Sequence, residues 1–497
     1  MLGAGGQRKR QAPGRPARAA AAAAAAAVGA AAAAVAGVVF VPDGQESGLQ
    51  PLGVILFSKL QQALVERSGR SAAAAGLSLS LARYLHQVVL GTPAGMQPGQ
   101  RYMYRVGCLE GLWSAWTHLA APRGPCQFSE QQPASLLVVG DLGFYNSQTV
   151  PDLVREVHGG QYDALLHIGD LAYDLQGLQG RRAAQFLRRV EPLASRLPYM
   201  VLPGNHEVHY NFSHYRELFT MPNRPLGENL FYSFDIGPMH VLVYNTEVLY
   251  WPDSFSVASM RLMYDWMEHD LQAANRNRER TPWVMVAGHR PMYCAAIRGT
   301  SCDWGWVREH EASRLGIPSR CSPLHPLLCP PTHADNNASF PIEGLFYRYG
   351  VDIAVFGHQH DYERDFPVYN LTVAPFAMGS IAGAARGGGS GEESAVYLNP
   401  RATVHVVSGA GGNAEMHRGT EPPPSGPCNH TAPWCAFQSG YAPQGKQSSD
   451  YSYSRVKALN ASHLYWEQYS TTLKRVVDSW WLVQEQHGPF NGSLAME

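Results

Sequence analysis

Five short apolar runs in the middle of the chain each end at a glycine that introduces a side chain able to bind a metal. They are residues 136–139, 164–168, 199–202, 283–287 and 353–356, and segments with helical patterning separate them. Short β-type runs that alternate with helices predict an α/β domain. Loops at the carboxyl ends of neighbouring strands converge in such folds, and glycine permits the sharp turn there. We therefore expect the side chains that follow the five runs to meet at one place.

The side chains at these strand ends are oxygen and nitrogen donors. In chain order they form the series Gly140-Asp141, Gly169-Asp170 with Tyr173, Gly204-Asn205-His206-Glu207, Gly288-His289, and Gly357-His358-Gln359-His360. Taken singly, an Asp after a strand most often caps a turn, and a His beside a core strand is most often a hydrogen-bonded structural residue. The ordered set, with every member at a strand end, instead indicates a metal site built by convergence.

This series resembles that of the purple acid phosphatases, the iron/zinc purple acid phosphatase-like proteins of the calcineurin-like metallophosphoesterase superfamily. The resemblance covers roughly residues 135–485. Supporting matches lie at residues 288–294 (GHRPMYC), 361–364 (DYER), 367–370 (PVYN) and 404–412 (VHVVSGAGG). The resemblance implies an α/β fold in which a metallophosphoesterase β-sandwich is flanked by helices and preceded by an incomplete fibronectin-III-like β domain.

Four segments follow from this organisation. Residues 1–41 form a low-complexity or signal-like segment, 42–131 a partial fibronectin-III-like domain, 132–380 the catalytic core, and 381–497 the C-terminal part of the catalytic domain. Partial alternation of apolar and polar residues at 83–90 and 99–107 predicts antiparallel strands in the second segment. Residues 404–407 and 475–483 are strand-like as well, and we expect them to complete the edges of the sheet.

The resemblance also implies which side chains hold metal. Two ions are expected, a ferric ion held by Asp141, Tyr173 and His360, and a divalent ion held by Asn205, His289 and His358, with Asp170 bridging the two. Trivalent iron prefers hard anionic oxygens, which carboxylate and phenolate supply. Zn(II) or Fe(II), with Mn as a further candidate, accepts imidazole and amide oxygen. Tyr173 discriminates within the superfamily, because relatives without a tyrosinate lack the stable ferric site and its colour.

The implied activity is that of an acid phosphatase, in which a hydroxide activated by the two metals attacks a phosphate monoester. His206 follows a ligand directly, so it can reach the substrate without coordinating a metal. We predict that it is catalytic, either binding the phosphate or protonating the leaving group. The alternative is that His206 only orients Asn205 or an Asp. Glu207 is expected to be structural.

Two other functions stay open at this point. One is a phosphodiesterase or nucleotide pyrophosphatase of the same superfamily, and the other is a non-catalytic metal-binding glycoprotein. The complete ligand series argues against the second of these. The sequence leaves open the physiological substrate, the identity of the second metal and the oligomeric state.

Composition limits the partners and the compartment. The formal charge is −1, from 39 basic and 40 acidic side chains, which does not favour nucleic acid or an anionic membrane as a partner. A phosphate ester is the expected substrate, and no stable membrane partner is expected. Eight cysteines include three close pairs, Cys294/Cys302, Cys321/Cys329 and Cys428/Cys435. Six Asn-x-Ser/Thr sequons accompany them, at Asn211, Asn337, Asn370, Asn429, Asn460 and Asn491. Both signals predict a secreted or extracellular protein, with the lysosome as the other candidate compartment.

Overall fold

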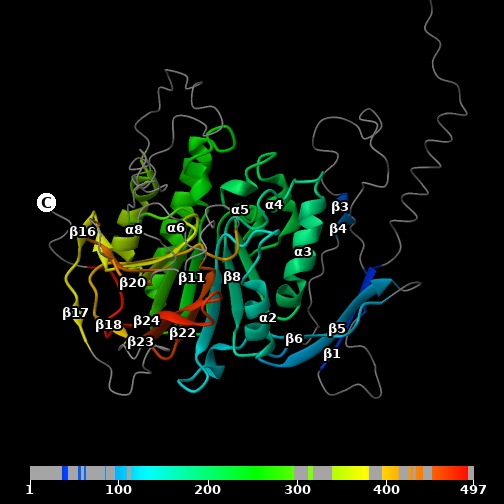
Figure 1. The fold of residues 1–497 in the computed structure, drawn as a ribbon, viewed down its shortest axis with the longest axis horizontal. Helices are drawn as coiled ribbons and strands as arrows, with labels where there is room; N and C mark the ends of the chain where they lie inside the picture. The colour runs from blue at the N-terminus through cyan, green and yellow to red at the C-terminus, as the bar shows by residue number, and fades with distance from the viewer. Residues whose placement is uncertain are drawn as a thin grey trace, which may run out of the picture. The chain divides into compact units, whose positions relative to one another are not determined.

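The computed structural model describes residues 36–42, 54–56, 61–62, 84–85, 96–108, 113–295, 312–316, 339–379, 394–413, 425–428, 432–439 and 450–490 (Figure 1). The chain divides into two compact units. The smaller comprises Met1–Met96 and Arg101–Leu119, and the larger comprises Gln97–Gln100 and Ala120–Glu497. Among the described residues, no helix combines the length and the apolar character that crossing a bilayer requires.

The smaller unit contains a four-stranded sheet in the order β2-β1-β5-β6. Its strands are β1 (Ala36–Pro42), β2 (Val54–Leu56), β5 (Arg101–Cys108) and β6 (Thr117–Ala120), and a separate pair is formed by β3 (Gln61–Gln62) and β4 (Tyr84–Leu85). Strand β5 overlaps all but the first two residues of the range 99–107, where alternation predicted a strand, and β1 lies largely in the segment predicted to be low-complexity or signal-like. Most of residues 42–95 fall outside the described residues, so the fibronectin-III-like domain stays a prediction.

The larger unit is built on two eight-stranded sheets. The first has the order β10-β11-β12-β13-β19-β14-β21-β20, with bounds β10 (Tyr232–Ile236), β11 (Met239–Val243), β12 (Trp283–Ala287), β13 (Ile353–Phe356), β19 (Val404–Ser408), β14 (Tyr362–Asp365), β21 (Cys435–Ser439) and β20 (Ser425–Pro427). The second has the order β17-β18-β24-β23-β22-β7-β8-β9, with bounds β17 (Ala377–Met378), β18 (Ala395–Leu398), β24 (Arg475–Val483), β23 (His463–Ser470), β22 (Ser452–Ala458), β7 (Ala134–Val139), β8 (Ala164–Ile168) and β9 (Tyr199–Leu202). A short hairpin joins β15 (Val368–Tyr369) to β16 (Thr372–Val373).

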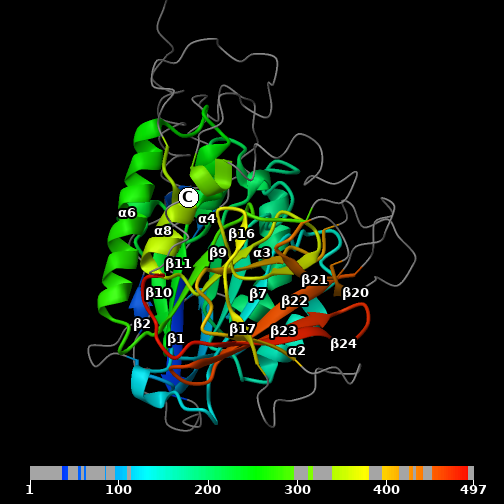
Figure 2. The same cartoon turned by 90° about the vertical axis from the view of Figure 1, so that its left-hand side faces the viewer.

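Helices cover the outer faces of the two sheets (Figures 1 and 2). They are α2 (Val150–His158), α3 (Arg181–Ala194), α4 (Ser213–Leu218), α5 (Arg224–Gly227), α6 (Val257–Arg276) and α8 (Ile342–Tyr349), with single 3₁₀ turns at η3 (Pro125–Gln127), η4 (Asn205–Glu207) and η5 (Thr246–Leu249). One apolar core combines residues of both sheets, among them Leu136, Met285 and Trp466. A second core combines the outer faces of the strands with the helices. The resulting layers are helix, sheet, sheet, helix, as the predicted β-sandwich flanked by helices requires.

Sequence explains why these elements form. Every residue of β7 and β8 is buried, because each strand has the second sheet on one face and helices on the other, and such strands read as continuous apolar runs. In α3 the buried residues Ala183, Phe186, Val190 and Leu193 recur at steps of three and four, which places them on one face of the helix. Helix α6 begins at a capping serine, Ser256, whose side chain accepts a hydrogen bond from the Ser259 amide.

The five predicted strands are present as β7, β8, β9, β12 and β13. One expectation was wrong: residues 404–407 and 475–483 do form strands, β19 and β24, but neither lies at a sheet edge. Strand β19 runs parallel to β13 and antiparallel to β14, and β24 runs between β18 and β23.

Candidate metal centre

The predicted ligands lie at the carboxyl ends of strands from both sheets. Asp141, Asp170 and Asn205 follow β7, β8 and β9 of one sheet, while His289 and His358 follow β12 and β13 of the other. Within each group the strands run parallel to one another, so their carboxyl ends lie at the same edge. Asp141, Asp170 and His358 have positive φ angles of 55°, 50° and 68°. Such angles are uncommon outside glycine and gather at functional sites, where the surrounding structure holds them.

Asp141, Tyr173 and His360 form one group of donors. The Tyr173 hydroxyl lies 3.1 Å from Asp141 Oδ1 and 2.8 Å from His360 Nε2. His360 Nε2 is 3.4 Å from the same Asp141 oxygen. The other Asp141 oxygen accepts a hydrogen bond of 2.8 Å from the His358 backbone amide, which fixes the carboxylate. Carboxylate, phenol and imidazole thus point at one spot, and Asp141 is fully buried there.

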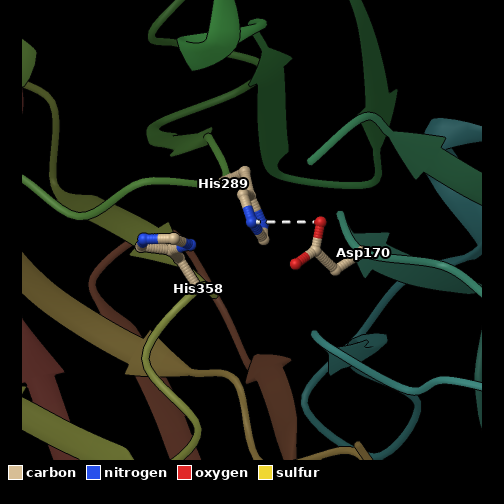
Figure 3. Close-up of side chains that lie close together, drawn as sticks. All are labelled: Asp170, His289 and His358. Carbon is tan, nitrogen blue, oxygen red and sulfur yellow. Dashed lines mark ion pairs between the residues drawn. The ribbon is translucent and has the colours of Figure 1, made fainter. Parts of the chain in front are cut away.

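Asp170, Asn205, His289 and His358 form the second group (Figure 3). His289 Nε2 lies 3.4 Å from Asp170 Oδ1 and 3.1 Å from Asn205 Oδ1. Ligand atoms of Asp170, His289 and His358 all lie within 4.8 Å of one another. Figure 3 shows both imidazoles and the Asp170 carboxylate turned towards a common centre. Asp170 and His289 are buried at 1% and 0% exposure, so water screens little of their charge.

The tautomer of His289 suits metal binding. Its Nδ1 lies 3.0 Å from the Ile168 carbonyl oxygen, which only accepts hydrogen bonds, so Nδ1 carries the proton in the neutral ring. The lone pair of Nε2 then faces Asp170 and Asn205. A hydrogen bond from the far ring nitrogen is the usual way in which proteins orient a metal-binding histidine.

Two glycines provide the close approach that this arrangement needs. Gly169 has φ +92°, and a Cβ added to it would overlap His289 Nδ1. A Cβ at Gly204 would overlap Asp170 Oδ1. The backbone turns therefore pass directly against the donors, and any larger residue at either position would displace a predicted ligand.

Glu207 clamps the two loops that carry Asp170 and Asn205. Its carboxylate accepts backbone hydrogen bonds from Asp170 at 3.0 Å, Leu171 at 3.0 Å and Gly204 at 2.9 Å. The side chain is 2% exposed. It contacts backbone amides on both sides of the site, as a positioning residue does.

His206 lies beside the second group without joining it. Its backbone amide donates to Asp170 Oδ1 at 2.9 Å, whereas its ring Nε2 is 4.0 Å from Asp170 Oδ2. The ring is partly exposed and packs on Tyr173, with centroids 4.3 Å apart. Its Nδ1 contacts Asp174 Oδ1 at 3.1 Å. The imidazole is therefore oriented by a carboxylate and reachable from solvent at the edge of the donor cluster.

Three further contacts were not predicted. Arg290 Nη1 lies 3.2 Å from His358 Nε2, and Arg290 itself is held by Glu247 at 2.9 Å. Burial and this guanidinium lower the pKa of His358, which favours the neutral imidazole that a metal requires. Asn413 Nδ2 lies 2.8 Å from His360 Nε2. The contact of Asp174 with His206 was also not predicted, although Asp174 directly follows Tyr173 in the sequence.

The charges of Asp170 and His289, which are both buried, explain how this pair would exchange a proton for a cation. Burial opposes the charge on His289, but Asp170 outweighs it and raises the pKa of His289 to about 10. Burial likewise opposes the charge on Asp170, and His289 with His206 lowers the pKa of Asp170 well below its usual range. A bound cation would take the place of the imidazole proton next to the carboxylate. The donor types, the fixed tautomer and the glycine turns together fit a pair of metal ions.

The fold and the donor series define a calcineurin-like phosphoesterase, and the family model of that description matches residues 134–362. A second model, described as iron/zinc purple acid phosphatase-like protein C, matches residues 402–479. The acid phosphatase type 7 of Danio rerio is 36% identical over 410 residues, which are 82% of this chain and 79% of that protein. The chain therefore belongs to the purple acid phosphatase family, as its sequence predicted.

Two more relatives agree with this assignment. The acid phosphatase type 7 of Homo sapiens is 34% identical over 406 residues, covering 82% of this chain and 78% of that protein. Among solved structures, the purple acid phosphatase PPD1 from seeds of yellow lupin (Lupinus luteus) matches with a TM-score of 0.58. It is 20% identical, and the match covers 90% of this chain and 69% of the lupin chain. That likeness confirms the predicted fold class of the larger unit.

Proposed function

We propose that the protein is an acid phosphatase that hydrolyses phosphate monoesters at a dinuclear metal centre. The observation that carries the proposal is the meeting of two donor groups at the ends of five strands, one around Asp141 and one around Asp170. Membership of the purple acid phosphatase family and the names of the relatives support it. The donor chemistry of the two groups differs, which is what two different metal ions require.

The first group is the proposed ferric site, with Asp141, Tyr173 and His360 as its ligands. The second is the proposed site of a divalent ion, Zn(II), Fe(II) or Mn(II), with Asn205, His289 and His358 as ligands and Asp170 shared. Phenolate and carboxylate suit a trivalent ion, and imidazole with amide oxygen suits a divalent one. When bound, such a pair of ions orients the phosphate, stabilises developing charge on its oxygens and lowers the pKa of a coordinated water.

Side chains of the protein hold the two loops of the site in place and supply a proton to the leaving group. Glu207 holds the Asp170 and Asn205 loops at a fixed separation through three backbone amides. His206 is the proposed proton donor to the leaving group, because Asp174 accepts from its Nδ1 and leaves Nε2 facing the site. The hydrogen bond with His206 also lowers the pKa of Asp174, so an ionised carboxylate stands beside the imidazole and holds it in place. A role of His206 in contacting the phosphate uses the same geometry.

The direct test is hydrolysis by the purified full-length protein. We expect an aryl phosphate monoester to be cleaved faster than its diester, with an acidic pH optimum. His206→Asn is expected to lower kcat about 10²-fold or more while the iron content stays unchanged. His269→Gln, on the exposed side of α6, is the matched control and is expected to have no effect. Faster cleavage of the diester would favour the phosphodiesterase alternative, and metal binding without hydrolysis would favour the non-catalytic one.

We also propose that the protein is secreted and carries N-linked glycans. Cys428 and Cys435 form a disulfide, and Cys294 is disulfide-bonded too. Asn211 and Asn370 are exposed and suit a glycan. Asn460 does not, because its side chain contacts Glu130 and caps the turn at Ser462.

Expression in a secreting animal cell tests this placement. We expect the protein in the medium, with a mass shift on endoglycosidase treatment that Asn211→Gln together with Asn370→Gln reduces. Retention of an unmodified protein inside the cell would contradict the proposal.

A further inference from the structure

A row of three buried acidic residues begins at Asp361, directly after His360, and continues along β14. Asp361, Glu363 and Asp365 occur at alternate positions, so they share one face of the strand. Their exposed fractions are 5%, 1% and 0%. The intervening Tyr362 and Arg364 point to the opposite face, where both contact Asp478 of β24. The row therefore gathers three acidic side chains on the outer face of the sheet.

Asp365 is the unusual member of the row. Within the described part of the chain, neither of its carboxylate oxygens accepts a hydrogen bond from any donor. Its close neighbour is the carboxyl group of Glu363, which can hydrogen-bond to Asp365 only when one of the two groups is protonated. The adjacent cation, Arg364, is committed to Asp478 through contacts of 2.8 Å and 3.1 Å. A fully buried carboxylate in such surroundings requires a compensating positive charge.

The geometry of the pair suits a single ion. Ligand atoms of Glu363, Asp365 and Cys435 lie within 4.8 Å of one another. Two oxygens that each lie about 2.3 to 2.6 Å from one Ca²⁺ are at most about 5 Å apart, so this spacing is compatible with a shared ion. Cys435 is bonded to Cys428 in a disulfide and offers no thiolate. The remaining donors are hard carboxylate oxygens, which favour Ca²⁺ over Zn²⁺.

We propose that Glu363 and Asp365 bind a hard divalent cation, Ca²⁺ by preference, at a structural site separate from the phosphatase centre. Asp361 lies next to them in the row, and one of its oxygens accepts a hydrogen bond of 3.2 Å from Gln438. A bound ion would hold three segments of the chain together. Glu363 already accepts from the Ala295 amide at 2.9 Å, in the loop that follows His289. Asp365 is paired in the sheet with Cys435 of β21.

A bound ion would therefore stabilise the strand that directly follows the loop of His358 and His360. The competing explanation is a proton shared between the two carboxyl groups. Burial, and after it the charge of Glu363, raises the pKa of Asp365 well above its usual range, so a bare carboxylate is costly there. A shared proton neutralises one charge of the row, whereas a divalent ion neutralises two. These two explanations differ in the response of the protein to Ca²⁺.

The experiment uses the full-length protein with its catalytic metals in place. It is desalted into calcium-free buffer and titrated with Ca²⁺ by calorimetry, and its melting temperature is followed in parallel. We expect about one Ca²⁺ per chain and a higher melting temperature. Asp365→Asn is expected to weaken Ca²⁺ binding at least about tenfold and to abolish the thermal shift. Asp450→Asn is the matched control, since Asp450 is equally buried but accepts a hydrogen bond of 2.9 Å from Ser439.

The readouts separate this site from the phosphatase centre. Iron content and hydrolysis of an aryl phosphate are expected to stay unchanged in Asp365→Asn, while Asp450→Asn keeps the Ca²⁺ response. If Asp365→Asn fails to fold, the wild-type titration alone decides. No binding of Ca²⁺ or Mg²⁺ by the wild type at millimolar concentration overturns the proposal. A wild type insensitive to Ca²⁺ together with a more stable Asp365→Asn would assign the row to a shared proton instead.

Discussion

Replacing Glu207 tests how the metal-binding loops are held. Its carboxylate accepts hydrogen bonds from the Asp170, Leu171 and Gly204 amides at 2.9 to 3.0 Å, with no more than 2% of the residue exposed. In Glu207→Ala all three amides lose their acceptor. In Glu207→Gln the Leu171 amide, or the pair formed by Asp170 and Gly204, faces an NH₂ group instead. The first change is therefore expected to be the more damaging.

The magnitude follows from the cost of unpaired buried groups. Each buried amide without an acceptor costs about 1 to 3 kcal/mol, and water entering the cavity recovers part of the sum. We expect Glu207→Ala to lower the free energy of unfolding by about 3 to 5 kcal/mol, and Glu207→Gln by about 1 to 3 kcal/mol. Because the carboxylate joins two loops, both variants are also expected to bind less of the metal at the Asp170 group.

The assay is thermal unfolding of metal-depleted protein, so that changes in metal affinity do not enter the comparison. A loss of 1 kcal/mol corresponds to about 2 °C or slightly less in a unit of this size. Glu207→Ala should therefore melt roughly 5 to 10 °C lower. Glu228→Gln, an exposed glutamate that pairs with Arg216, is the control and should change little. Equal melting temperatures for Glu207→Ala and the wild type would refute the clamp.

Three further outcomes follow from the structure. Burial opposes the charge of His240, but hydrogen bonds to Asp235 and Asp270 raise the pKa of His240 from 6.5 to about 9. Its contribution of roughly 1 to 3 kcal/mol is thus complete below pH 6.5 and lost as pH rises through 9, and urea unfolding of His240→Gln should lack this loss. Asp174→Asn should lower kcat about 10- to 100-fold with unchanged iron content, and an unaltered kcat would remove Asp174 from the mechanism. Phe186→Ala should cost about 3 to 5 kcal/mol by urea unfolding, because Phe186 lies fully buried on the inner face of α3.

The five strands, and the places of the predicted ligands at their ends, could be predicted from sequence because each strand carries its own local signal. An apolar run gives the strand, the following glycine gives the turn, and the next residue gives the donor. Asp141, Asp170 and His289 are predicted ligands on this basis, and the structure places each of them in one of the two groups of close side chains. Their convergence followed from one general rule about the carboxyl ends of strands.

The remaining features depend on contacts between distant parts of the chain. Asn413 reaches His360 across 53 residues, and Arg290 reaches His358 across 68, so no local pattern marks either contact. The interior positions of β19 and β24 were missed because an apolar strand is the same in sequence wherever it pairs. The acidic row ending at Asp365 is visible in the sequence, but its burial, which makes it a candidate cation site, is visible only in the structure.

Metal analysis combined with visible absorption, on the wild type and on Tyr173→Phe, tests the central claim most directly. The account predicts about two metal ions per chain, one of them iron, and a visible band from phenolate bound to ferric ion in the wild type. Tyr173→Phe should lose that band while Asp141 and His360 keep iron in the site. An unchanged spectrum in the variant, or a wild type that binds no iron, would contradict the account.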